Sequence, residues 1–463
     1  MNAPLIWIGF PIGIAAILFF LRGRPNLVWI AAILANAFLA LLAFSIPTGR
    51  PVNLGFILLP VGDSSVILGR RFILESGDRP FLGLIFTFGA FWFGGGKVAR
   101  ANRYFIPLGM VVMALLVAAL AVEPFLYAAL LVEMAVLVSI PILSPPGQPV
   151  GQGVLRFLVF QTLAMPFILI AGWAASAVET NPADKRLLLQ AVILLGLGFA
   201  FWLAVFPFYN WMPLMISQTN PFVTSFIVLL LNTLVFLLGL DFLNAFAWLR
   251  EFAPLYSALR LVGTIMVVTG GIWAVFQQDL ARVLAYSIIV ENGFSLLALS
   301  LDSRTGFEIF VSLFLARLIS VALFSLSLTI LAEITSPDLQ GLRGIIQRMP
   351  LASVALLMGL FGIAGLPLLA VFPMRLYLLE NLAQVSIANA IWPAIGMVCL
   401  IAFGLRLLAS IVRSDEKLWK FGESGIQSFF LFGGIFFVLV IGIFPRWFLP
   451  GIQKLLEGFS QLR

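Results

Sequence analysis

The chain has 463 residues, of which 62% are hydrophobic and only 10% are charged, and its formal net charge is +7. A soluble protein carries about a quarter charged residues, so this composition excludes a soluble globular enzyme and indicates an integral membrane protein. The sequence has one cysteine, Cys399, and no histidine, which excludes disulfides and thiolate metal sites and removes the commonest metal ligand. Nothing in it indicates nucleic acid binding, because its short basic clusters are typical of loops beside lipid headgroups.

Apolar runs of membrane-spanning length follow one another along the whole chain, because a helix needs about 20 apolar residues to cross the hydrocarbon core. They predict about 14 transmembrane helices, at 4–21, 26–46, 81–95, 104–122, 124–143, 154–177, 188–206, 222–240, 255–277, 283–300, 307–331, 350–372, 385–410 and 428–448. Residues 51–80 are amphipathic and are expected at a membrane interface. The fold class is therefore an all-α polytopic membrane protein, and we expect no extramembrane domain and no cleaved signal peptide.

Ionisable side chains occur inside three of these runs and just after a fourth. They are Glu133, Glu291, Arg317 and Arg375. A charged group in hydrocarbon costs roughly 2.5–3.5 kcal/mol on insertion scales, so such residues pair, face water or work. Any single one could instead form a structural ion pair or lie near the interface.

The uncharged stretch VFPFYNWMPLMISQTNP, residues 205–221, interrupts two apolar runs. Pro213 and Pro221 are expected to stop backbone hydrogen bonding there, and the polar side chains around them can satisfy the freed groups. A second Pro-containing break lies around Pro367 and Pro373. Paired breaks of this kind are typical of helices that line a polar cavity.

Four segments, in order, resemble one family, the antiporter-like membrane subunits of respiratory complex I, of Mrp-type cation/proton antiporters and of membrane-bound hydrogenases. The segments read VEPFLYAALLVEMAVLVSIPIL, FPFYNWMPLMISQTNPFVTSF, QQDLARVLAYSIIVENGFSLLAL and LQGLRGIIQRMPLASVALLMGLFGIAGLPLLAVFPMRLYLL. They extend from about residue 104 to 376, and outside them only the number of spans and the length agree.

This resemblance implies two inverted five-helix repeats, each with one broken helix. The implied divisions are N-terminal helices and an amphipathic segment at 1–103, a first repeat at 104–240, a second repeat at 255–410, and a C-terminal loop and last span at 411–463. The broken helices are expected near 213–221 and near 367–373.

The family's proton path combines a glutamate with several lysines, and the resemblance places only part of it in the first repeat. Glu133 matches the fifth-helix glutamate. The seventh-helix lysine is replaced by Trp202, and the eighth-helix lysine falls on Asn232 or Thr233. A histidine of the family's Pro-Phe-His pattern is replaced by Tyr209.

In the second repeat the matching positions are Glu291, Arg317 and Arg375, while a further lysine position is occupied by Val321. Burial can shift a lysine toward neutrality, but arginine does not release its proton. The candidate path residues are therefore Glu133, Glu291, Arg317, Arg375, Asn232 and Tyr209, in a path that we expect to be impaired or silent.

Three functions fit this pattern. The first is a membrane-arm subunit of a complex I-like redox complex, partnered by other membrane subunits in a bacterial inner membrane or an organelle or thylakoid-type energy-converting membrane. The others are an Mrp-like cation/proton antiporter and a non-transporting scaffold of another membrane redox or carbon-uptake complex. We expect no redox catalysis, cofactor or metal in this chain, because the glycines at 94–96 form no dinucleotide-binding motif after a strand.

Overall fold

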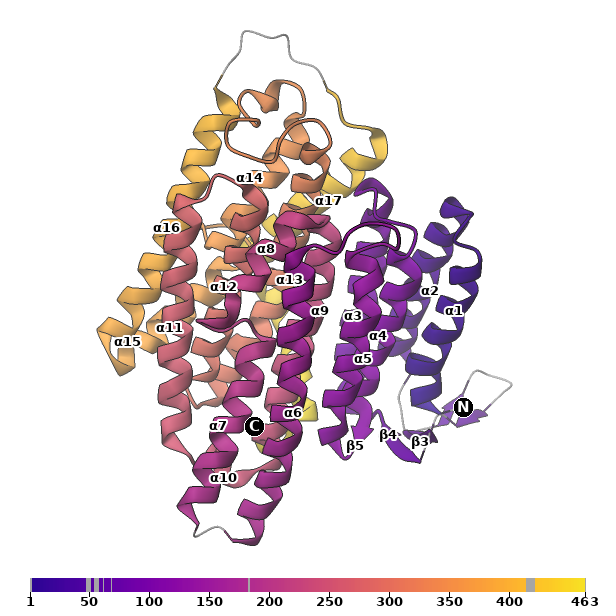
Figure 1. Ribbon diagram of the computed structural model, residues 1–463, viewed down its shortest axis with the longest axis vertical. Coiled ribbons are helices and arrows are strands. Elements are labelled where there is room, and N and C mark those ends of the chain that lie inside the picture. The colour runs from indigo at the N-terminus through magenta and orange to yellow at the C-terminus, as the bar shows by residue number, and fades with distance from the viewer. Residues whose placement is uncertain are drawn as a thin grey trace. The chain divides into compact units, whose positions relative to one another are not determined.

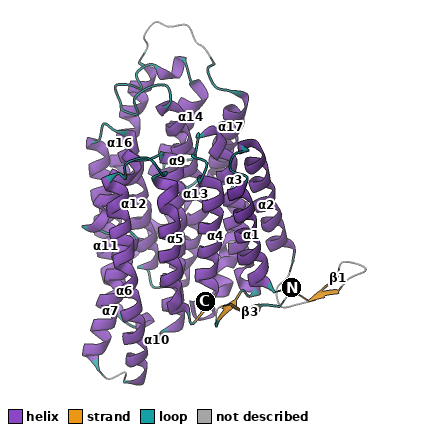
Figure 2. Cartoon of the chain, turned by 45° about the vertical axis from the view of Figure 1, so that its right-hand side comes forward, coloured by secondary structure: helices purple, strands orange, loops and turns teal. Residues whose placement is uncertain are grey.

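The computed structural model describes residues 2–46, 51–53, 58–60, 62–67, 69–181, 184–413 and 421–462. The chain divides into two compact units (Figure 1). The first comprises Met1–Leu203, Ile227–Phe252 and Lys454–Arg463, and the second comprises Ala204–Phe226 and Ala253–Gln453. Long helices make up most of each unit, and the few short strands all belong to the first (Figure 2).

The first unit begins with a short π-helical turn and contains most of the helix α9. Its helices are η1 (Leu5–Gly9), α1 (Phe10–Phe20), α2 (Pro25–Ser45), η2 (Ser76–Asp78), α3 (Arg79–Val98), α4 (Phe105–Ala121), η3 (Phe125–Tyr127), α5 (Ala128–Leu143), α6 (Gln152–Thr180), α7 (Lys185–Trp202), α9 (Pro221–Ala245), α10 (Ala247–Arg250), η7 (Lys454–Gly458) and η8 (Ser460–Leu462). The pairs α2–α3, α4–α5 and α6–α7 pack closely, as expected of consecutive antiparallel helices.

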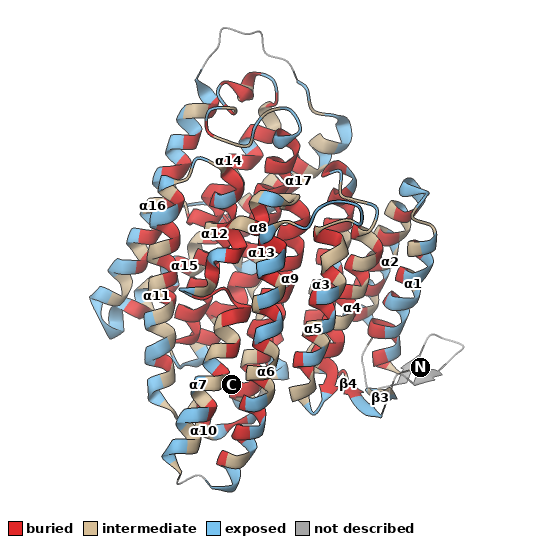
Figure 3. Ribbon diagram, in the orientation of Figure 1, coloured by how far each residue is buried: buried red, intermediate tan, exposed pale blue. Residues whose placement is uncertain are grey.

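The second unit contains the start of α9 and the two most deeply buried spans that lie wholly within it, α12 and α13. Its helices are η4 (Phe208–Asn210), α8 (Trp211–Gln218), α11 (Ala253–Phe276), α12 (Leu280–Leu299), α13 (Arg304–Ala332), η5 (Ile345–Gln347), α14 (Pro350–Ala364), α15 (Phe372–Val385), α16 (Ile387–Val412), α17 (Gly425–Ile443), η6 (Pro445–Trp447) and α18 (Leu449–Gln453). In the most apolar stretch of α12, and likewise of α13, 89% of the residues are buried, so these two helices form the centre of the unit. By contrast, α16 and α17 expose much of their surface (Figure 3).

The predicted membrane-spanning runs coincide with apolar helices. Among the described residues, eleven helices are long and apolar enough to cross a membrane, and three shorter apolar helices lie at Leu5–Phe20, Phe105–Ala121 and Pro350–Ala364. Each of the fourteen predicted runs overlaps one of these fourteen helices. The all-α polytopic membrane class is therefore confirmed.

The amphipathic segment 51–80 contains short strands that its pattern did not predict. Strands β1 (Pro51–Asn53) and β2 (Leu58–Pro60) pair antiparallel. Strands β3 (Ser64–Ile67) and β4 (Arg70–Ile73) form a hairpin, and β5 (Val122–Glu123) joins its edge at the end of α4. A residue that turns this hairpin, Gly69, has φ +74°, a conformation that glycine adopts without strain.

The first interruption lies at Thr219 and Asn220, between α8 and α9. The Asn220 Oδ1 atom accepts hydrogen bonds from the backbone N–H groups of Phe222 (3.1 Å) and Val223 (3.2 Å), so it caps α9. The expectation that Pro213 stops backbone hydrogen bonding is wrong, because Pro213 lies in the first turn of α8, where no intrahelical donor is needed.

The second interruption separates α14, which ends at Ala364, from α15, which begins at Phe372. Gly365 ends α14 in the left-handed region, with φ +78°. Pro367 lies within the interruption, and Pro373 lies in the first turn of α15, where proline is tolerated.

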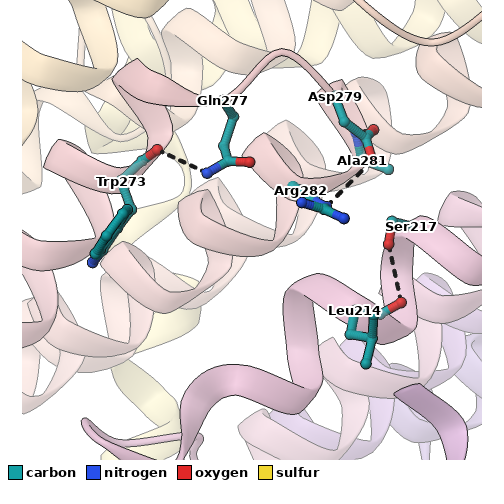
Figure 4. A network of polar contacts seen from close by, with 7 residues as sticks. All are labelled: Leu214, Ser217, Trp273, Gln277, Asp279, Ala281 and Arg282. Carbon is teal, nitrogen blue, oxygen red and sulfur yellow. Dashed lines mark hydrogen bonds and ion pairs between the residues drawn. The ribbon is translucent and has the colours of Figure 1, made fainter. Parts of the chain in front are cut away.

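Asp279 caps the N-terminus of α12 (Figure 4). Its Oδ1 atom accepts a hydrogen bond from the Ala281 N–H at 2.9 Å, and its Oδ2 atom lies 3.7 Å from the Arg282 Nε atom. Just before it, the Gln277 amide donates to the carbonyl of Trp273 near the end of α11. In α8, which the same view includes, Ser217 donates to the carbonyl of Leu214.

We expect Asp279→Ala to lower the free energy of unfolding by about 1 kcal/mol, because α12 loses its cap. Burial raises the pKa of Asp279, so folding favours the protonated carboxyl, and the stability that this group contributes falls as the pH rises through its folded pKa. Asp279→Asn keeps a capping oxygen and is never ionised, so it should match the wild type at acidic pH and should not share the fall in stability as the pH rises. Thermal unfolding of the wild type and the two variants in detergent, at acidic and neutral pH, measures the loss of the cap and the pH dependence. If Asp279→Asn loses as much stability as Asp279→Ala, the capping role is contradicted.

Candidate functional site: a buried charge cluster in the second unit

A fully buried ion pair joins α12, an interior helix of the second unit, to α15, a helix that exposes much of its surface. The Arg375 Nη2 atom lies 2.6 Å from the Glu291 Oε1 atom, and neither side chain has any exposed surface. Glu291 lies in the middle of α12, and Arg375 lies in the first turn of α15, directly after the second interruption. A pair of this kind needs good geometry, because the desolvation of two charges opposes their attraction.

The neighbouring residues hold the Arg375 side chain in place. Its guanidinium lies 4.2 Å from the ring centroid of Phe294, which is three residues after Glu291 and therefore on the same side of α12. A Cβ atom at Gly365 would lie 3.2 Å from the Arg375 Cδ atom. The left-handed glycine that ends α14 thus also leaves room for the arginine.

Arg317, on α13, is the third buried charge. It has no exposed surface, and its Nη1 atom donates to the Ser295 Oγ atom at 3.3 Å. Ser295 in turn donates to the backbone carbonyl of Glu291 at 3.0 Å, and the charges of Arg317 and Glu291 attract one another. The cluster therefore combines two arginines with one glutamate, an excess of one positive charge away from water.

The sequence singled out all three charged residues of this cluster but did not predict that they meet. Ser295 and Phe294 were missed, although their spacing of four and three residues from Glu291 places them on the same helical face. Val321, at a lysine position of the implied path, is one turn beyond Arg317 and is also completely buried.

Glu133 has different surroundings, in the first unit. It lies on α5 and is partly buried, and the Thr162 hydroxyl of α6 donates to its Oε1 atom at 2.8 Å. Among the described residues, Glu133 forms no ion pair with a lysine or arginine. Arg317 is therefore fully buried, whereas Glu133 is buried only in part.

Trp202, at the position of the implied seventh-helix lysine, is completely buried at the end of α7. Its backbone carbonyl accepts a hydrogen bond from the Gln161 side chain at 3.3 Å, and its ring meets that of Phe199 edge to face. The indole thus fills volume that a lysine would share with water. Asn232 and Thr233 are buried further along α9.

Tyr209 belongs to the second unit, in the turn η4 before α8. Its ring stacks on Phe206 at 6.0 Å and contacts Tyr286 of α12 edge to face at 6.2 Å. Within the described part of the chain, no three aspartate, glutamate or cysteine side chains come together in a way that could hold a metal ion.

Comparison with known protein families identifies the family of this chain. The model of the family described as "NADH:quinone oxidoreductase/Mrp antiporter, TM" matches residues 158–403, more than half of the chain. The chain belongs to this family. The match contains the whole of the buried charge cluster, α7, α8, α9 and both helix interruptions.

Curated members of the family align over different lengths. Subunit 14 of the NADH-quinone oxidoreductase of Thermus thermophilus is 28% identical over 86% of this chain and 96% of its own length. Subunit N 1 from Chloroherpeton thalassium is 24% identical over 58% of each chain.

Solved structures of the family share the fold at lower identity. A chain of respiratory complex I from Thermus thermophilus has a TM-score of 0.78 at 20% identity, covering 99% of both chains. A chain of the Mrp complex from Dietzia has a TM-score of 0.81 at 15% identity, covering 99% of this chain and 97% of that one. A chain of the archaeal membrane-bound sulfane sulfur reductase has a TM-score of 0.82 at 17% identity, covering 99% of this chain and 98% of that one.

Proposed function

We propose that this chain is a membrane-arm subunit of a complex I-like energy-converting complex, bound to other membrane subunits, in which it does not move protons by the lysine relay of its family. The near full-length match to subunit 14 of an NADH-quinone oxidoreductase supports the first part. The buried charge cluster supports the second.

The observation that carries the proposal is that both buried cations of the cluster are arginines. A relay station must lose and regain its proton, and a guanidinium, with its very high intrinsic pKa, stays protonated. Arg375 is bound to Glu291 at 2.6 Å, so its charge is held in one place. Fixed positive charges in a medium of low dielectric also repel a migrating proton.

The first unit supports the same conclusion. A glutamate and a lysine can exchange charge because both can become neutral, whereas Glu133 is hydrogen-bonded to a hydroxyl, which cannot hold a positive charge. Trp202 occupies the position at which the family has the lysine that pairs with this glutamate. Asn232 and Thr233 can orient water but do not titrate.

Glu133→Gln in the intact complex tests the proposal. We expect the number of protons pumped per electron to be unchanged, because no proton passes through this carboxylate. The measurement is proton uptake by membrane vesicles alongside the rate of quinone reduction.

Two controls make this result interpretable. Glu123→Gln removes an exposed carboxylate of β5 and should behave as the wild type. Copurification of the other subunits shows that the variant assembles. A lower ratio of protons to electrons in Glu133→Gln, with electron transfer and assembly intact, would show that the path is active.

A further inference from the structure

A basic pocket lies at the end of the first unit opposite the strands. It has a volume of about 250 Å³ and is formed by the turn between α1 and α2, the start of α2, the end of α3 and the loop before α4. Four basic residues line it, namely Arg22, Lys97, Arg100 and Arg103.

Among the described residues, no carboxylate forms an ion pair with Arg22, Lys97 or Arg103. The sequence has no aspartate or glutamate in residues 1–62 or in residues 79–122, which contain α1, α2, α3 and α4. The residues that line the pocket include no acidic side chain. Like charges so close together repel, so an anion in the pocket is strongly favoured.

Aromatic rings and backbone groups position the cations instead. The Arg22 guanidinium lies 4.2 Å from the ring centroid of Phe19, and the Lys97 ammonium lies 4.9 Å from that of Trp29. The Trp29 indole is fixed by a 2.9 Å hydrogen bond to the carbonyl of Gly94. Contacts with rings leave the N–H groups of these cations available to an anion.

The surface beside the pocket is apolar. One side of α2 exposes large hydrophobic residues at a spacing of three or four, which places them in a continuous stripe along the helix. They are Leu27, Ile30, Leu34, Phe38 and Leu41. The stripe begins at the pocket and follows a helix of 21 residues that is apolar enough to cross the membrane.

We propose that the pocket binds the phosphate headgroup of an anionic phospholipid whose acyl chains lie along the exposed stripe of α2. The charge of the pocket selects an anion, and the stripe selects a lipid over free phosphate. Phosphate is the group for which several lysine and arginine side chains are the usual partners.

The test compares lipids with the same acyl chains on the purified, delipidated wild-type protein in detergent. Dioleoylphosphatidylglycerol should bind at least tenfold more tightly than dioleoylphosphatidylcholine, as measured by native mass spectrometry. Brominated phosphatidylglycerol should quench tryptophan fluorescence more than brominated phosphatidylcholine, and Trp29→Phe should remove that difference. Equal binding of the two lipids would overturn the proposal without any variant.

The double variant Lys97→Gln with Arg103→Gln should weaken phosphatidylglycerol binding about 30-fold, since each basic residue near an anionic surface contributes roughly fivefold. The matched control, Lys185→Gln with Arg186→Gln, removes the same charge from the exposed start of α7 and should bind as the wild type. Retained binding in the first variant would contradict the proposal. Displacement of the lipid by millimolar inorganic phosphate would assign the pocket to free phosphate instead.

Discussion

Arg375→Met should destabilise the second unit by about 3–5 kcal/mol, because it leaves the Glu291 carboxylate buried without its partner. Both side chains are completely buried, and the Arg375 Nη2 atom lies 2.6 Å from the Glu291 Oε1 atom. Solvent water therefore cannot replace the arginine as the partner of the carboxylate. Glu291→Leu should have a larger effect, because it leaves both Arg375 and Arg317 buried without a counter-charge. Thermal unfolding in detergent and the yield of assembled complex measure the loss.

The double variant Glu291→Leu with Arg375→Met provides the control. Replacing a buried ion pair by hydrophobic residues of similar volume is often neutral, so the double variant, which leaves only Arg317 as a buried charge, should be more stable than Glu291→Leu, which leaves two buried arginines. The coupling free energy from this cycle isolates the pair from its surroundings. If the two single losses simply add, the side chains do not depend on one another in the way that their geometry indicates.

Gly271→Ala should destabilise the packing of α11 against α16 by roughly 1–3 kcal/mol or more, the range for overpacked interiors. A Cβ atom at Gly271 would lie 2.8 Å from the Cα atom of Gly396 and closer still to its carbonyl oxygen. Because these are backbone atoms, they cannot move to another rotamer as a side chain can, so α11 and α16 must move apart. Small residues at such crossings are typical of membrane helices.

Gly433→Ala in α17 is the matched control, since nothing lies within 4 Å of a Cβ atom placed there. It should be neutral or stabilising by up to about 1 kcal/mol, because alanine favours helix over glycine. Thermal unfolding under the same conditions compares the stability of the two variants with that of the wild type. Equal behaviour of Gly271→Ala and Gly433→Ala would contradict the close approach of α11 and α16.

Apolar runs predicted the helices well, because membrane-spanning length and composition are written locally in the sequence. The strands at residues 51–73 were missed for the opposite reason. Their pairing depends on partners elsewhere, and β5 comes from residues 122–123 at the end of α4. A short amphipathic segment alone does not distinguish a strand from an interfacial helix.

The candidate site was predicted as a set of residues, not as an arrangement. The cost of burying charge singled out Glu291, Arg317 and Arg375 from the sequence. Their meeting depends on the tertiary packing of α12, α13 and α15, which no local pattern encodes. The roles of these residues, and of Glu133, Asn232 and Tyr209, stay predictions.

The order of synthesis gives the buried cluster a consequence for membrane insertion. Glu291 leaves the ribosome 84 residues before Arg375, which at roughly 5–20 residues per second is a delay of about 4–17 s. Arg317 emerges in between, on the helix that directly follows α12, so it supplies the first counter-charge. The helical hairpin of α12 and α13 is thus the smallest piece in which Glu291 has a counter-charge, and a chain that ends before α15 lacks the arginine that binds Glu291 directly.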